Sequence, residues 1–95
     1  MSAYIVADCE VTDSVRYEAY KKLAQAAVAK HGGRYIVRGG ETTVLEGEWQ
    51  PHRIVVLEFP SPSAVRRFHA SPEYRAARAE REGAARMNMI TVAGA

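Results

Sequence analysis

Charged residues interrupt apolar rows in the two segments with the strongest β-forming character. Arg38 ends RYIVR, and Glu58 lies near the end of HRIVVLEF. Alternation predicts that Arg38 shares a strand face with Ile36, and that Glu58 shares one with Ile54 and Val56. A carboxylate in a buried row must be paired or neutral.

Asp8 and Asn88 lie in similar rows, beside Val6 and Ile90. Because the second and third strands form a hairpin and the first and third are expected neighbours, some of these groups are expected to converge on one polar spot. Two interpretations stay open. Arg38 and Glu58 form a structural or dimer-interface salt bridge, or Arg38 clamps an anionic or carbonyl oxygen while Glu58 moves a proton. In the second case Asp8 and Asn88 are candidate ligand-binding residues.

A third candidate region surrounds the helix break at Ser71-Pro72, which His69 and Tyr74 flank. Histidine is the common acid–base residue near neutral pH, so His69 is a candidate catalytic group. Tyr74 is a candidate cavity wall that binds a ligand. The alternative is that both are packing residues, with the Tyr74 hydroxyl bonded to backbone.

Other chemistry is disfavoured. The three histidines share no metal-ligand spacing, and Gly39-Gly40 lacks the context of a phosphate-binding loop. Cys9 alternates with Ile5 and Ala7 and is expected to be an inert core thiol. We therefore expect neither a metal nor a cofactor.

Hydrophobic spacing predicts the elements that position these residues. Strands are expected at 3–11, 34–38, 42–45, 52–59 and 86–92, and helices after Asp13, after Ser61-Pro62 and at 73–85. Two helical crossovers around a central hairpin give a β-α-β-β-α-β order, an α+β fold with one antiparallel sheet.

The length and the net charge of the chain limit the classes of function that it can have. The 95 residues form one domain, 1–95, and a net charge of +2 without a basic run disfavours nucleic-acid binding. No apolar run approaches the roughly 20 residues that span a bilayer, so no membrane partner is expected. The N-terminus lacks signal-peptide features, and together with a single cysteine this predicts a cytoplasmic location.

Apolar residues occupy both faces of the predicted strands. Val55, Leu57 and Phe59 form one face of residues 52–59, and Ile54 and Val56 begin the other. The helices cover one face only, so we predict a homodimer in which two sheets pack face to face.

Five short segments in order resemble those of the family catalogued as domain of unknown function 1330. They are Gly32-Gly33-Arg34-Tyr35, Arg38-Gly39-Gly40, Leu45-Glu46-Gly47, Glu58-Phe59-Pro60-Ser61 and Ser71-Pro72-Glu73-Tyr74. The resemblance implies a ferredoxin-like sandwich that assembles as a dimeric α/β barrel. It implies no established reaction.

Two functional hypotheses remain, and the sequence does not decide whether the chain is an enzyme. The first is a cofactor-independent oxygenase, isomerase or cyclase acting on a small organic molecule bound between sheet and helices. The second is a non-catalytic dimeric ligand-binding or accessory protein. A cavity lined by Arg38 and Glu58 would favour the first, and one filled by Tyr4, Phe68 and Tyr74 the second.

Overall fold

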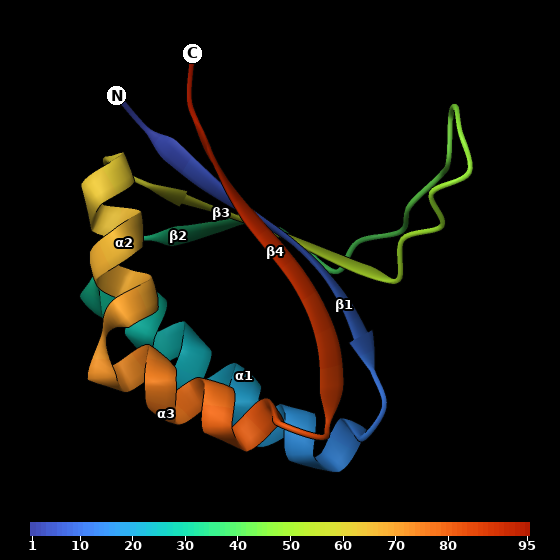
Figure 1. The fold of residues 1–95 in the computed structure, drawn as a ribbon, viewed down its shortest axis with the longest axis horizontal. Helices are drawn as coiled ribbons and strands as arrows, with labels where there is room; N and C mark the ends of the chain where they lie inside the picture. Colours follow the sequence, from blue (N-terminus) through green and yellow to red (C-terminus); the bar gives the residue numbers. More distant parts are fainter.

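The computed structural model describes residues 1–95 as one sheet with helices on one of its faces (Figure 1). The elements are β1 (Ala3–Val11), α1 (Ser14–Lys30), β2 (Arg34–Arg38), β3 (Arg53–Phe59), α2 (Pro62–Ala70), α3 (Pro72–Arg81) and β4 (Ala85–Ala93). All strand pairs are antiparallel, in the order β2-β3-β1-β4. The predicted β-α-β-β-α-β order is confirmed, with its second helix divided into α2 and α3.

Side-chain caps set the starts of the helices. The Asp13 carboxylate accepts a hydrogen bond from the Arg16 backbone N–H at the start of α1. Ser61 and Ser71 do the same for α2 and α3, each followed by a proline in the first turn. These oxygens satisfy N–H groups that have no partner within the helix.

Ser71 also joins α2 to α3. Its hydroxyl donates to the Phe68 carbonyl oxygen at 2.7 Å while accepting from the Tyr74 N–H at 3.1 Å. Through these two hydrogen bonds, the buried Ser71 both ends α2 and begins α3. It places the rings of Phe68 and Tyr74 side by side, with centroids 4.5 Å apart.

The sheet has one covered face and one open face. The covered face packs against α1, α2 and α3, and its buried residues include Ile5, Cys9, Leu57 and Phe59. The open face carries the alternate residues of each strand, several of them apolar: Val6, Val37, Ile54, Val56, Ile90 and Val92. Ile90 and Val92 remain 63% and 48% exposed. The expectation that both faces are apolar is confirmed, and the helices cover only one.

Residues 39–52 connect β2 to β3 as an arm that projects from the body of the molecule (Figure 1). The strand predicted at 42–45 is wrong: the segment has no regular structure, and Leu45 is 90% exposed. A β-prone sequence forms a strand only where a neighbour supplies ladder hydrogen bonds, and no strand lies beside this one.

None of the three helices has the length and apolar character needed to cross a membrane.

Candidate functional site

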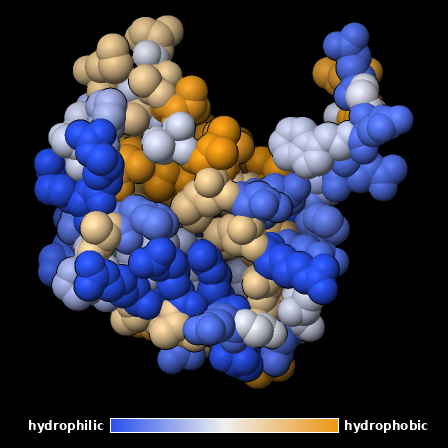
Figure 2. Space-filling view, in the orientation of Figure 1, coloured by the Kyte–Doolittle hydropathy of each residue, from blue (hydrophilic) through white to orange (hydrophobic).

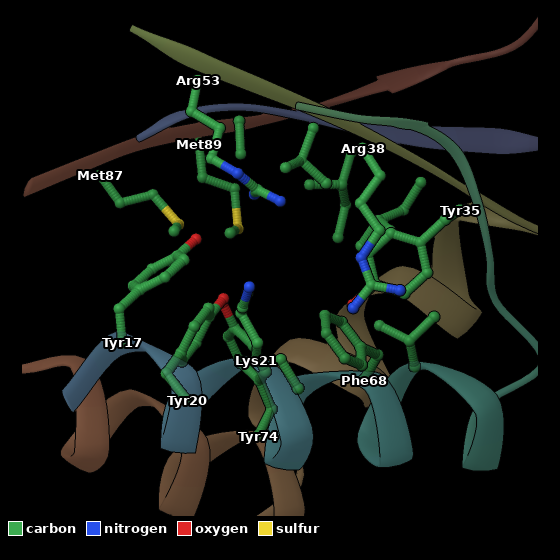
Figure 3. Close-up of a pocket in the computed structure, with 16 residues that line it drawn as sticks. Tyr17, Tyr20, Lys21, Tyr35, Arg38, Arg53, Phe68, Tyr74, Met87 and Met89 are labelled. Atoms are coloured by element: carbon green, nitrogen blue, oxygen red, sulfur yellow. The ribbon is translucent and has the colours of Figure 1, made fainter. Parts of the chain in front are cut away.

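A small cavity lies between the covered face of the sheet and the helices (Figure 3). Its volume is about 30 Å³, room for one or two water molecules. Thirteen of its sixteen lining residues are hydrophobic or tyrosine, and the other three are Lys21, Arg38 and Arg53. No carboxylate lines it.

The cations at this cavity differ in their partners. Lys21 pairs with Glu18 at 2.7 Å on the surface of α1. Arg38 donates only to the neutral Gln25 side chain, at 3.0 Å, and Arg53 is in no ion pair. Figure 3 shows all three side chains directed toward the cavity. Two arginines without a carboxylate make it a place where an anion gains charge-assisted hydrogen bonds.

A register shift in β2 brings Arg38 to the cavity. Tyr35 pairs with Leu57, but Val37 pairs with Val56, so the ladder is irregular at Ile36. The extra residue turns Tyr35 and Arg38 to the same, covered side, where the Arg38 guanidinium lies 4.2 Å from the Tyr35 ring centroid. Such an irregularity re-aims the side chains that follow it.

The predicted convergence of Arg38 and Glu58 is therefore not found. Glu58 lies on the open face, where the Arg34 Nε donates to it at 2.7 Å and the Tyr4 hydroxyl donates at 3.2 Å. The hydrogen bond from Arg34 is the main reason that the pKa of Glu58 is below its usual value. An arginine–glutamate pair is present, but its arginine is Arg34.

Tyrosines supply the polar atoms at the helix side of the cavity. The hydroxyls of Tyr20 and Tyr74 are 2.9 Å apart, and the Arg81 Nη1 donates to Tyr74 at 3.0 Å. Burial is the main cause that raises the pKa of Tyr17, Tyr20 and Tyr35, so these phenols stay neutral at physiological pH.

A count of protons shows what the tyrosine pair offers a ligand. The two hydroxyls carry two protons, and the bond between them uses one. Arg81 acts as donor to both oxygens and competes for neither proton. The second phenol proton has no acceptor among these contacts and is available to a ligand oxygen in the cavity.

Asp8 and Asn88 lie on the open face, paired across β1 and β4. The Asp8 carboxylate accepts from the Trp49 indole N–H at 3.1 Å and from the His52 backbone N–H at 2.9 Å. It fixes the end of the arm that leads into β3. Asn88 is exposed beside it.

His69 lies outside the cavity, in an open groove of about 310 Å³ between α2 and β4. Its Nε2 is 3.4 Å from an Arg78 guanidinium nitrogen, so this ring nitrogen acts as the acceptor. Burial and Arg78 lower the pKa of His69, which is therefore neutral at pH 7. Figure 2 shows hydrophobic surface gathered in the hollow between α2 and β4.

Of the six residues predicted to form a site, the structure brings only Arg38 and Tyr74 to the cavity. Sequence reasoning missed Arg53 and the tyrosines of α1. The signal for Arg53 was present, because it lies two residues before Val55 and alternation places both on one face.

A model of the family described as domain of unknown function (DUF1330) matches residues 2–95. The chain belongs to the DUF1330 family. The resemblance seen in the five short segments is thus confirmed. A search of the curated proteins finds no match to the DUF1330 chain.

Several solved structures share the fold of this DUF1330 chain. A protein of unknown function from Rhodopseudomonas palustris is 18% identical with a TM-score of 0.79, and the match covers 99% of this chain and 82% of that one. SnoaB, a cofactor-independent oxygenase from Streptomyces nogalater, is 14% identical with a TM-score of 0.68, over 99% and 93%. A dimeric ferredoxin-like protein of unknown function from Jannaschia is 11% identical with a TM-score of 0.71, over 99% and 100%. At these identities the likeness shows the ferredoxin-like fold alone.

The role of Asp8 can be tested through Trp49, the only tryptophan of the DUF1330 chain. Replacing Asp8 with Ala removes the acceptor for both the indole and the His52 N–H, so the end of the arm should gain mobility. Fluorescence anisotropy of Trp49 is expected to fall and its emission to shift to the red. Glu46→Ala, which removes a carboxylate of the arm that is in no ion pair, is the control and should leave both unchanged. Equal spectra for wild type and Asp8→Ala would contradict this role.

Proposed function

We propose that this DUF1330 chain is a homodimer whose cavity, on the covered face of the sheet, binds a small, largely apolar organic molecule with an anionic or ionisable oxygen. It acts on that molecule as a cofactor-independent enzyme of the oxygenase, isomerase or cyclase type. The observation that carries the proposal is the charge of the cavity, where Arg38 and Arg53 lack a carboxylate partner.

The arrangement suits an oxyanion. An arginine can donate two parallel hydrogen bonds to a carboxylate or enolate oxygen, and it does so most strongly where water is scarce. The hydrophobic lining reduces the competing water more at half-buried Arg53 than at exposed Arg38, and the tyrosine pair adds a neutral donor that Arg81 polarises. These donors are in place before a ligand arrives, so they would stabilise negative charge that develops during a reaction.

The shared fold supports, by analogy, the hypothesis that the chain is an enzyme. SnoaB, with the same ferredoxin-like fold, is described as a cofactor-independent oxygenase. At 14% identity this analogy concerns the architecture and not the residues. The roles proposed for this chain therefore rest on its own geometry: Arg38 and Tyr74 bind the oxygen of the ligand, and the Nε2 of His69, at the rim of the groove, accepts a proton once it gives up its hydrogen bond from Arg78.

A non-catalytic ligand-binding protein is the second candidate. None of the side chains that line the cavity is a carboxylate or a histidine, so proton abstraction within the cavity has no base. Glu58, Asp8 and Asn88 lie on the open face, on the opposite side of the sheet from the cavity. Binding of an organic anion is common to both candidates, and turnover of the bound molecule separates them.

The homodimer is supported by the open face. Apolar residues on all four strands face outward there, and a face of this size is rarely left in water by a stable monomer. Solved structures of the same fold from Jannaschia and Thermobifida fusca are described as dimeric. The charged pair Arg34–Glu58 and the residues Asp8 and Asn88 would lie at the polar margin of that interface.

The anion site predicts a charge-dependent affinity. In calorimetric titrations, benzoate should bind more tightly than the uncharged benzamide. Arg38→Gln and Arg53→Gln should each weaken benzoate binding about tenfold or more, since one hydrogen bond to a charged group contributes roughly 1.5–3 kcal/mol. Benzamide binding should change little.

Arg34→Gln is the matched control, because Arg34 lies on the same strand but on the open face. It should retain the wild-type affinity for benzoate. An equal loss in Arg34→Gln and Arg38→Gln would show that net charge, and not the cavity, governs binding.

The dimer predicts a mass of twice the 10.5 kDa chain in sedimentation at micromolar concentration. Val56→Arg places a charge at the middle of the open face and should yield a folded monomer, because two such charges would face the same interface. Val15→Arg, at a position 82% exposed on α1, should remain dimeric. A monomeric wild type, or a dimeric Val56→Arg, would refute the face-to-face assembly.

A further inference from the structure

The groove that contains His69 and the cavity that contains Arg38 are separated by a thin wall. The two hollows have two lining residues in common, Ile5 and Met89. The groove is about ten times larger, at roughly 310 Å³ against 30 Å³. A ligand larger than one or two waters needs more room than the cavity offers, and movement of this wall would join the cavity to the groove.

The two residues of the wall differ in mobility. Ile5 belongs to the central strand β1, is 2% exposed, and has a β-branched side chain with restricted χ1. Met89 belongs to the edge strand β4, and its unbranched side chain has three rotatable bonds. Met89 is therefore the part of the wall that can move.

Met87 provides an internal comparison on the same strand. Both methionine side chains enter the cavity from β4 (Figure 3). The Arg81 guanidinium donates to the Met87 sulfur at 3.0 Å and holds it in place. Met89 has no such hydrogen bond, and only Met89 also lines the groove.

We propose that Met89 is a gate between the groove and the cavity, and that the ligand is an elongated organic anion that occupies both. This inference rests on the proposed function. The carboxylate or enolate end lies at Arg38, Arg53 and the tyrosine pair. The apolar body, an aryl or bicyclic ring system, passes Met89 into the groove.

The lining of the groove fits that apolar body. Val65 from α2 and Met89 from β4 lie on its two sides, and Figure 2 shows this hollow as hydrophobic surface. Arg66 and His69 lie at its rim. A body in the groove would therefore come next to His69, the only histidine or carboxylate that lines either hollow.

Stopped-flow fluorescence with 2-naphthoate tests the gate. Met89→Ala removes the barrier and should raise the association rate constant on the order of tenfold, since a required conformational change is what slows association. Met89→Phe should lower it. Met87→Ala enlarges the cavity without opening the wall, so it should alter the dissociation rate constant and leave association unchanged. Circular dichroism and thermal unfolding establish that each variant is folded.

The outcomes separate the gate from the proposed function. Equal association rate constants for wild type, Met89→Ala and Met87→Ala, or an equal rise in both alanine variants, would overturn the gate. In that case the anion site stands as long as Arg38→Gln weakens binding of 2-naphthoate. If wild type binds neither 2-naphthoate nor benzoate, the anion site is wrong and the gate fails with it.

Discussion

The register shift at Ile36 decides which side of the sheet each charge of β2 faces. In a regular strand Arg34 and Arg38 lie four residues apart and point the same way. One extra residue between Tyr35 and Val37 separates them. Arg34 then meets Glu58 on the open face, and Arg38 reaches the cavity beside Tyr35. Without this shift the cavity would lose one of its two arginines that have no carboxylate partner, and that arginine would lie on the open face.

The two faces consequently have different chemistry. On the covered face, unpaired arginines and neutral phenols surround a small hydrophobic cavity, an arrangement that favours a bound anion. On the open face, the acidic groups already have partners: Glu58 has Arg34 and Tyr4, and Asp8 has Trp49 and His52. Surplus positive charge therefore lies with the cavity, and satisfied polar groups lie among the apolar residues that a second copy would cover.

Much of the fold could be predicted because it depends on local signals. The caps at Asp13, Ser61 and Ser71 and the two apolar faces of β1, β3 and β4 follow from spacing and residue type alone. The candidate site was harder to predict from the sequence than the fold. Nothing in RYIVR indicates a register shift, which arises from how β2 pairs with β3, so alternation placed Arg38 on the wrong face. The tyrosine pair joins α1 to α3 across 54 residues of sequence, a contact that only the packing of the helices creates. Arg53 is predictable from alternation with Val55, but at the start of its strand it resembles a solvent-facing end residue.

Arg38 and Arg53 make the covered side of the sheet the side that we expect to hold an organic anion. Anomalous diffraction at the bromine edge from crystals soaked in 4-bromobenzoate tests it directly. We expect a carboxylate within hydrogen-bond distance of Arg38 or Arg53, with the bromine peak on the Met89 side of the cavity. A bromine peak only on the open face of the sheet, or a cavity that still holds no 4-bromobenzoate at saturating concentration, would contradict it.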